Sequence, residues 1–427
     1  MINFAKEIIR MSFQLSARQA RFIDKILCNR YLGIFIFIVV IWLVFQATFG
    51  LGHYPMIWLT DLFFLIEDLL LKILPVSAFR SLLINGVLKG IGGVMIFMPN
   101  IVILFTLLSL LEESGYMARV ALIMDKLMQP LGLNGKSFMS LVMGFGCNVP
   151  AIMAAQSIQN KNSRIITILI NPLMSCSSRF TVYVLFISAF FPEHPATVLF
   201  FVYFTSVLLA MFISLILKKY IFKATTEFFN VDLPKFRLPK PKRIVKFMWF
   251  NAKMFLKKIT GAILIASVVI WFLGYFPHNF DNKNIEKSYL GMTGKFIEPA
   301  IAPLGFDWKM GISLITGVAA KETIVGLMSQ LYQPEHKTGD DKKNLVESLR
   351  TQTYTSGPKK GQKIFNPLVA LSFIFFVSIY TPCVGTIATI HKTIKRRKWT
   401  IFVILYTTIL AWVISFLIYN IGNYFVQ

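Results

Sequence analysis

Long runs of apolar residues dominate the chain, and short polar or basic segments separate them. Six of these runs are long enough to span a bilayer as a helix, which takes about 20 mainly apolar residues. The runs are Leu32–Phe49, Ile91–Leu111, Ala196–Leu217, Phe255–Phe276, Phe365–Ile390 and Ile401–Tyr419. The pattern therefore predicts an all-α polytopic membrane protein.

Two further apolar stretches, 136–158 and 309–331, are interrupted near their centres. The interrupting residues are Gly144, Gly146 and Pro150 in the first stretch and Gly317 in the second. Each arm is about nine residues, or about 14 Å of helix, which is about half the thickness of the hydrocarbon core. We therefore expect two re-entrant hairpins whose tips lie near the middle of the membrane.

The two hairpins belong to an internal repeat. A Pro-Leu-Gly triplet begins fourteen residues before Gly144, and another begins fourteen residues before Gly317. If the basic N-terminus and both basic linkers are cytoplasmic, the residues between Ile91 and Tyr220 cross the membrane an odd number of times. One of their four apolar stretches then cannot cross. We expect the first hairpin to enter from the cytoplasm and the second from outside, which is an inverted repeat with a site where the tips meet.

The same pattern divides the chain into six segments. They are a basic cytosolic segment at 1–30, a first span with an interfacial helix at 31–90, the first repeat at 91–219, a basic cytosolic linker at 220–254, the second repeat at 255–392, and a basic linker with a C-terminal span at 393–427. The interfacial helix is expected at Ile57–Leu74. The polar insertion 333–362 within the second repeat is expected to be a mobile loop.

Composition and charge agree with this class. The mean hydropathy is +0.64, and 56% of the residues are hydrophobic. The net charge of +24 gathers in short segments beside the spans, such as Lys235–Lys258, as the positive-inside rule predicts. We therefore expect no nucleic-acid partner. The four cysteines form no paired extracellular framework, and Cys28 in the basic N-terminal segment is taken as incidental.

Each hairpin is followed by a helix that carries a proline and a cysteine, Pro172 with Cys176 and Pro382 with Cys383. Proline kinks a helix and frees a carbonyl group beside the sulfur. Sulfur ligands suit a transition metal better than Na⁺ or Mg²⁺, and amide or carboxylate oxygens add harder ligands. The candidates for transient handling of Fe²⁺ or a similar divalent ion are Cys147, Cys176, Cys383, Met174, Asn148 and Glu322.

Simpler interpretations of these residues stay open. A cysteine in a membrane helix is most often a small apolar residue that fills space. Lys321 and Glu322 either neutralise each other structurally or take part in gating or in the ion path. We expect the sulfurs of Cys147 and Cys176 to approach each other. We also expect the side chains of Lys321 and Glu322 to diverge, one of them held by carbonyls freed at Pro382.

Four stretches carry a resemblance to a known family. They are Leu111–Arg119, Gly144–Pro150, Pro172–Cys176 and Ala320–Glu322. They closely resemble the membrane region of the bacterial ferrous iron transport protein B family, and the two halves resemble the gate modules of nucleoside-transporter-like proteins. The resemblance implies an inverted repeat of two gate-type modules with re-entrant hairpins. It also implies a multi-pass protein of the bacterial cytoplasmic (inner) membrane that imports Fe²⁺.

The resemblance also implies a set of partners and exposes two departures. Fe²⁺ is then the substrate, no cofactor is bound permanently, and the expected partners are membrane lipid, small cytosolic iron-transport accessory proteins and a second copy of the chain. The family normally carries a GTP-binding domain, but this sequence lacks the phosphate-loop pattern G-x-x-x-x-G-K-[ST]. We expect no enzyme activity, with GTP acting only through a separate subunit or a missing domain. Ser177 and Ser178 also replace the family's usual Gly-Ala.

Two other functions remain open on the sequence. One is a gate-domain transporter of a nucleoside or another organic solute, and the other is a membrane scaffold that does not transport. An organic-solute site predicts a larger cavity with aromatic and amide groups, whereas an iron path predicts sulfurs that converge.

Overall fold

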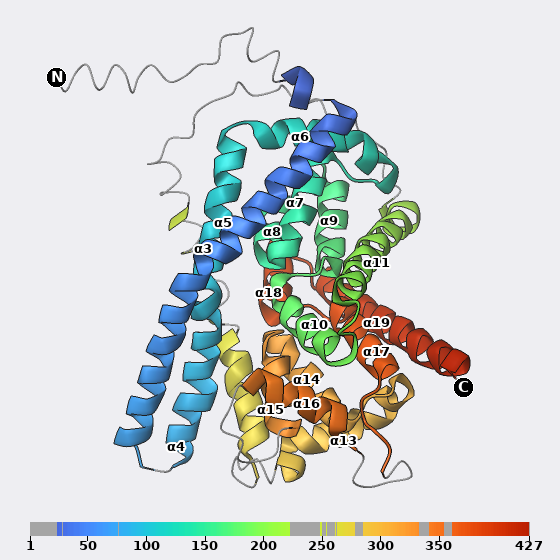
Figure 1. Ribbon diagram of the computed structural model, residues 1–427. Coiled ribbons are helices and arrows are strands. Elements are labelled where there is room, and N and C mark those ends of the chain that lie inside the picture. Colours follow the sequence, from blue (N-terminus) through green and yellow to red (C-terminus); the bar gives the residue numbers. More distant parts are fainter. Residues whose placement is uncertain are drawn as a thin grey trace, which may run out of the picture.

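The computed structural model describes residues 24–27, 29–75, 77–222, 248–249, 253, 261, 263–277, 285–332, 341–353 and 361–426. Within these ranges the regular structure is helical, apart from an isolated bridge between Thr353 and Lys363. In the described part of the chain, five helices are long and apolar enough to cross a membrane, and a sixth crossing results if the bent pair Met98–Glu113 and Tyr116–Leu131 counts as one. The predicted all-α polytopic class is confirmed (Figure 1).

A long pair of helices forms an arm beside the rest of the molecule (Figure 1). The helix α3 (Arg30–Ile73) starts at Asn29, whose side chain accepts hydrogen bonds from two amides of the first turn, and it runs for 44 residues through Pro55. The chain returns through α4 (Ala78–Ser81), the π-helix η1 (Leu82–Leu88) and α5 (Lys89–Glu113), which packs along α3.

The expected boundary between a first span and a separate interfacial helix is wrong. Residues Ile57 onward continue α3 without a break. Proline removes one backbone hydrogen bond from a helix, and the packing of α3 along α5 on both sides of Pro55 outweighs that loss. At 1.5 Å per residue α3 is about 66 Å long, more than twice the hydrocarbon thickness of a bilayer.

The first repeat consists of short helices followed by one long helix. Two breaks, at Cys147 and before Ser177, interrupt the short helices. Its elements are α6 (Tyr116–Met128), η2 (Gln129–Leu131), α7 (Gly135–Gly146), α8 (Asn148–Ala154), η3 (Ala155–Ser157), α9 (Lys161–Ile170), η4 (Asn171–Leu173), α10 (Ser177–Phe190), α11 (Pro195–Ile216) and η5 (Leu217–Phe222). Gly132, with φ 75°, turns the chain after η2, in a backbone region that favours glycine. Asn134 then starts α7 by accepting a hydrogen bond from the Ser137 amide.

The second repeat, with the C-terminal span that follows it, has a similar order of α-helices with α16 added, while the short 3-10 and π-helices differ. Its elements are a helix at Ile263–Tyr275, η6 (Ile285–Lys287), α13 (Tyr289–Ile301), η7 (Ala302–Leu304), α14 (Trp308–Ala319), α15 (Thr323–Tyr332), α16 (Asp341–Thr351), α17 (Pro367–Ile379), α18 (Val384–Ile394) and α19 (Arg397–Val426). Gly305, with φ 83°, and the capping residue Asp307 occupy the places that Gly132 and Asn134 occupy in the first repeat.

Each predicted hairpin contains a helix break at the expected place. Cys147 separates α7 from α8 with φ −156° and ψ 131°, and Ala320 ends α14 with φ −150° and ψ 133°. The two arms pack against each other in both hairpins. The breaks of the two repeats therefore have nearly the same local backbone, while the inverted relation between the repeats stays a prediction.

Part of the polar insertion is ordered as a helix, which corrects the expected loop. The described part of 333–362 contains α16, whose Leu345 and Leu349 are buried. Arg350 donates hydrogen bonds to the Ser188 and Ala189 carbonyls near the end of α10. Most residues of this segment are polar, so the sequence pattern did not indicate that the helix has an apolar face. Several of the predicted segments lie outside the described residues. They are 333–340, 354–360, the N-terminal residues 1–23 with Cys28, most of the linker 220–254 and the start of the expected span Phe255–Phe276.

The core of the molecule lies between α10, α17 and α19. The rings of Phe186 on α10 and Phe373 on α17 are 4.9 Å apart between centroids, and Phe306 packs edge-on against Phe373. α17 packs in turn along α19. Because α10 and α17 run antiparallel, the start of α10 meets the end of α17, and the breaks of the two repeats come together there.

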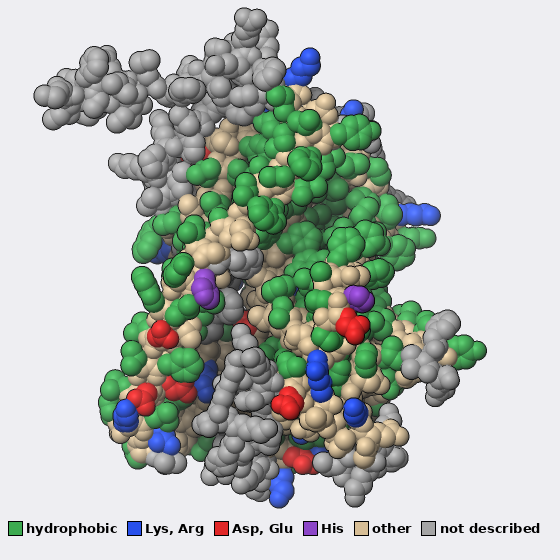
Figure 2. All heavy atoms as spheres, in the orientation of Figure 1, with side chains coloured by type: hydrophobic (Ala, Val, Ile, Leu, Met, Phe, Trp, Pro, Cys, Tyr) green, Lys and Arg blue, Asp and Glu red, His purple; other side chains and the backbone are tan. Residues whose placement is uncertain are grey.

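The outer surface is largely apolar. Hydrophobic side chains cover most of the face drawn in Figure 2, while several charged side chains gather toward its lower end. Exposed large hydrophobic residues recur along α3, α11 and α19, including Trp42, Phe200 and Leu405. Such a surface is expected of helices that face lipid.

Candidate functional site

Three of the cysteines occupy the same structural position. Cys147, Cys176 and Cys383 each immediately precede a helix, α8, α10 and α18, in extended backbone. Serine, threonine, asparagine and aspartate normally take this position, because a side-chain oxygen accepts from the first amides of the helix. A thiol sulfur accepts such hydrogen bonds only weakly, and all three cysteines are free and half-buried.

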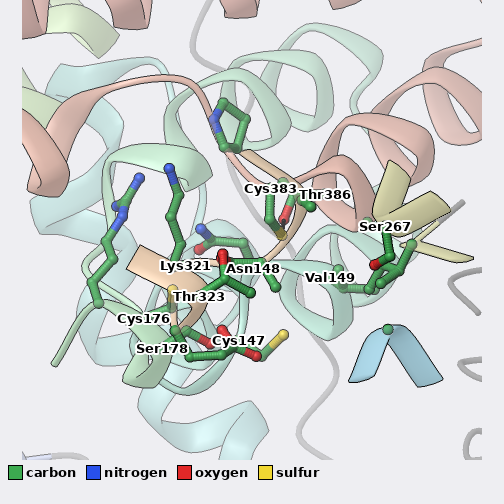
Figure 3. Close-up of a pocket in the computed structure, with 18 of the residues that line it drawn as sticks. Cys147, Asn148, Val149, Cys176, Ser178, Ser267, Lys321, Thr323, Cys383 and Thr386 are labelled. Atoms are coloured by element: carbon green, nitrogen blue, oxygen red, sulfur yellow. Dashed lines mark hydrogen bonds between the residues drawn. The ribbon is translucent and has the colours of Figure 1, made fainter. Parts of the chain in front are cut away.

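The three thiols line one cavity at the meeting point of the breaks (Figure 3). The cavity has a volume of about 940 Å³, counted out to its open mouth. Its chemically distinctive lining residues are Cys147, Cys176, Cys383, Asn148, Glu322, Lys321, Arg179, Ser178, Thr323, Thr386, Ser267 and Lys89. Both repeats contribute to it, and Cys147 and Cys176 share this space instead of lying on opposite faces of the bundle.

A buried amide network fixes the first break. Asn148 is 4% exposed, and in the orientation that its neighbours require, its amide nitrogen donates to the Gly144 and Asn171 carbonyls at 3.2 and 3.1 Å. Asn171 donates to the Ser140 carbonyl, and the Ser140 hydroxyl donates to the Ala151 carbonyl. The hairpin is thereby tied to the segment that leads to Cys176. The sequence analysis missed Asn171 and Ser140 as partners, although polar residues in apolar stretches were the available signal.

Arg179 joins the breaks of the two repeats, and the sequence analysis gave it no role. Its side chain is fully buried and donates to the Pro172 and Met174 carbonyls at 3.0 and 3.2 Å, and to the Tyr380 carbonyl at 3.4 Å. Carbonyls at the end of a helix carry partial negative charge. The guanidinium therefore satisfies groups that both breaks leave free, while its Nε has no hydrogen-bond partner among the described residues.

Lys321 and Glu322 diverge, as the sequence predicted. Lys321 is 2% exposed, and its ammonium donates to the Thr381 carbonyl at 2.6 Å and lies 3.1 Å from the centre of the Tyr380 ring. Glu322 is half-buried, lines the cavity and accepts a hydrogen bond from Ser178. The lysine is thus held by a carbonyl freed beside Pro382, and the carboxylate faces the cavity.

The remaining predicted residues take different places. Pro382 lines the cavity, whereas Met174 is 3% exposed, packs against Gly144 and is not among the lining residues. Gly317 allows close approach, since a Cβ there would lie 2.5 Å from the Tyr380 hydroxyl.

The other break residues shape the backbone near the cavity. The Gly146 carbonyl accepts a hydrogen bond from Ser177, and Pro150 and Pro172 are buried in α8 and η4. Among the described residues, no three His, Cys, Asp or Glu side chains are grouped so that they could hold a metal ion.

Fold and cavity together define the class: a polytopic membrane protein built of two broken-helix repeats that meet at a central cavity. The chain belongs to the gate family, whose model is described as "Gate: Nucleoside recognition" and matches residues 94–190 and 256–397. A second model, "Ferrous iron transport protein B C terminus", matches residues 199–251. The predicted resemblance to the membrane part of ferrous iron transport protein B is confirmed.

The relatives agree with this family. The chain is 40% identical to the Fe(2+) transport protein A/Fe(2+) transporter FeoB fusion protein of Porphyromonas gingivalis, over 98% of this chain and 53% of that protein. It is 40% identical to the Fe(2+) transporter FeoB of Staphylococcus aureus over 95% of this chain and 59% of the relative. It is 38% identical to the Fe(2+) transporter FeoB of Campylobacter jejuni over 92% of this chain and 64% of that protein. The chain thus spans little more than half the length of these relatives. No solved structure matches it.

Proposed function

We propose that the chain conducts Fe²⁺ into the cytoplasm across the inner membrane of a bacterium. One observation carries the proposal: three free thiols from three separate helix breaks line a single cavity together with a carboxylate. Thiol and carboxylate ligands suit a divalent transition metal. The curated relatives are named as Fe²⁺ transporters, which supports the same substrate.

The proposed path runs past donors that each hold the ion weakly. Conduction requires sites that bind an ion well enough to admit it and loosely enough to release it. Cys147, Cys176 and Cys383 supply sulfur, and Glu322 supplies the negative charge. Asn148 positions the first break, and its amide oxygen is a harder donor than the three sulfurs. The carbonyl partners of Lys321 and Arg179 compensate the two buried positive charges beside the path.

We infer that the path needs partners outside this chain. The fused Porphyromonas relative joins a Fe²⁺ transport protein A to the transporter, which supports a small accessory protein as one partner. Without a phosphate-loop pattern in this sequence, GTP would act through a separate GTP-binding subunit or domain. Lipid contact with the apolar faces and assembly of several copies belong to the same proposal.

Substitution of single cavity cysteines tests the function. Cys147→Ser and Cys383→Ser nearly keep the side-chain volume but replace a soft donor with a hard one. We expect each to lower ⁵⁵Fe²⁺ uptake roughly tenfold, the scale of a lost metal contact, in cells without other iron importers. Expression, followed by immunoblot, should stay at the wild-type level.

Cys28→Ser is the matched control, since Cys28 is a thiol expected to have no role. It should leave uptake unchanged. If both cavity variants take up Fe²⁺ at the wild-type rate, the cysteines only fill space and do not contact the ion.

An organic solute is the second candidate, because the matching family model is described by nucleoside recognition. Among the described residues, nineteen line the cavity, and these include a single amide, Asn148, and no aromatic ring. Stacking of a base normally uses aromatic side chains. Competition decides between the candidates: a nucleoside that blocks uptake, or is itself taken up, favours the second. A chain that moves neither solute with its partners present is the scaffold.

A further inference from the structure

Lys89, the first residue of α5, lines the cavity from the side of the arm. Its side chain is 49% exposed, whereas Asn148 and Lys321 in the same lining are 4% and 2% exposed. Lys89 therefore lies where the cavity opens. A charged side chain within an apolar helix that faces a cavity is more often functional than structural.

Two groups of the arm hold the ammonium. Lys89 Nζ lies 3.5 Å from Glu67 Oε1 on α3 and donates to Asn85 Oδ1 at 2.9 Å. Glu67 is 25% exposed, so part of the charge pair is shielded from solvent. Its carboxylate draws the ammonium toward the arm. The other charged lining residues lie deeper, where Arg179 and Lys321 are held by carbonyls and Glu322 by Ser178.

The backbone around Lys89 is fixed to the cavity wall. The π-helix η1 ends at Leu88, and π-helical turns often occur at functional sites. Gly90 lets α5 touch the helix Ile263–Tyr275, since a Cβ there would lie 2.7 Å from Ser267 Cβ. Trp271 on that helix donates to the Ser81 hydroxyl at 2.9 Å. The long side chain of Lys89 can therefore move while its backbone stays at the mouth.

We propose that Lys89 is an electrostatic gate at the mouth of the cavity and that Glu67 sets its position. The ammonium repels divalent cations when it extends over the mouth, and it admits them when Glu67 holds it against the arm. At separations of several ångströms in a partly aqueous site, removal of one positive charge changes the local concentration of a divalent cation roughly tenfold. The proposal rests on the proposed cation permeation, but its test does not depend on iron alone.

The first measurement is Fe²⁺ uptake by the full chain and its variants. Lys89→Gln should raise the initial rate about three- to tenfold, and Glu67→Gln should lower it by a similar factor because the ammonium is released over the mouth. The double variant should behave like Lys89→Gln, since Glu67 acts only through the lysine. Lys89→Arg keeps the charge and should resemble the wild type. Lys72→Gln is the matched control, an exposed lysine paired with Asp68 on the same arm.

The second measurement uses the cavity thiols as reporters. In a Cys28→Ser background, cationic and anionic methanethiosulfonate reagents label the three cavity cysteines, and peptide mapping gives each rate. Lys89→Gln should raise the ratio of cationic to anionic labelling about tenfold, and Glu67→Gln should lower it. An unchanged ratio in a folded Lys89→Gln protein overturns the gate, whatever its iron uptake. A shifted ratio in a protein that moves no iron with its partners present supports the gate and overturns iron as the substrate.

Discussion

Lys321 and Glu322 are neighbours in the sequence with different surroundings, and substitution should separate their roles. Lys321→Met leaves the buried Thr381 carbonyl without its donor, a loss of about 1–3 kcal/mol, so the yield of folded protein should fall. Glu322→Gln keeps the shape of the side chain and a hydrogen-bond acceptor for Ser178, so the protein should fold. Its Fe²⁺ uptake should fall, because the cavity loses its carboxylate. Fluorescence-detected size exclusion measures the yield.

An exposed pair supplies the control for this comparison. Glu286 contacts Lys295 on the surface, and Glu286→Gln should change neither yield nor uptake. If Lys321→Met and Glu322→Gln lose folded protein equally and the remaining protein transports normally, the Lys-Glu pair is structural and the ion path lies elsewhere.

Local signals in the sequence were enough to find some site residues and not others. Cys147, Cys383 and Lys321 stand next to glycine or proline breaks, and each break was recognisable from its own neighbours. Arg179 was not, because its contact with Tyr380 joins residues 201 positions apart. No pattern near Arg179 reveals that partner. Met174, which sulfur chemistry suggested as a ligand, stays a prediction: its Cβ and Cγ lie beside Gly144, and it is not among the described lining residues of the cavity.

At the scale of elements, the turn before each hairpin depends on a glycine. Gly305 has φ 83°, and a Cβ there would lie 2.6 Å from the Tyr419 ring of α19. Gly305→Ala should therefore destabilise the protein by about 2 kcal/mol or more, from the left-handed backbone and the contact together. The apparent melting temperature in detergent should fall.

Gly326, in α15 of the same hairpin, gives the matched comparison. Nothing lies within 4 Å of a Cβ at this position in α15. Gly326→Ala should leave the melting temperature unchanged or raise it slightly, since alanine favours helix by up to about 1 kcal/mol. Equal losses in both variants would contradict the role assigned to the turn.

Helix breaks were easier to predict from the sequence than helix continuity. The breaks at Cys147 and Ala320 follow from glycine and proline inside apolar stretches. The expected boundary between the first span and the interfacial helix did not form, and α3 continues through Pro55, because packing along α5 decides whether one lost hydrogen bond matters. The polar composition of 333–362 likewise concealed α16, whose two buried leucines are too few to form a visible pattern.

For the whole molecule, the expected inverted relation of the repeats, which stays a prediction, determines which side of the membrane each hairpin should open to. Gln156 follows α8 and Gln330 lies near the end of α15, and both are exposed. Gln156→Cys should react with a membrane-impermeant maleimide from the cytoplasmic side, and Gln330→Cys from the outer side. Oriented membrane vesicles measure this, with the unsubstituted protein giving the background of native thiols. Reaction of both from one side contradicts the inverted repeat.

The assembly of the cavity is the part of the molecule that lay beyond the sequence. The order of elements and the two breaks could be predicted from each repeat alone. A site where the hairpin tips meet was also expected, but the packing that assembles it was not, because it depends on the antiparallel contact of α10 with α17 through residues such as Phe186 and Phe373. Aromatic residues spread through every apolar run give no indication of which pairs meet.

At the starts of α8, α10 and α18, the stability of the fold and the proposed transport of metal favour different residues. Serine or asparagine at a helix start is worth about 1 kcal/mol more than a residue whose side chain accepts poorly from the first amides, such as cysteine. Exchange at these three positions would therefore strengthen the fold while it weakens metal transport. Under the proposed function, a lineage that no longer imports iron through such a protein should lose these thiols early.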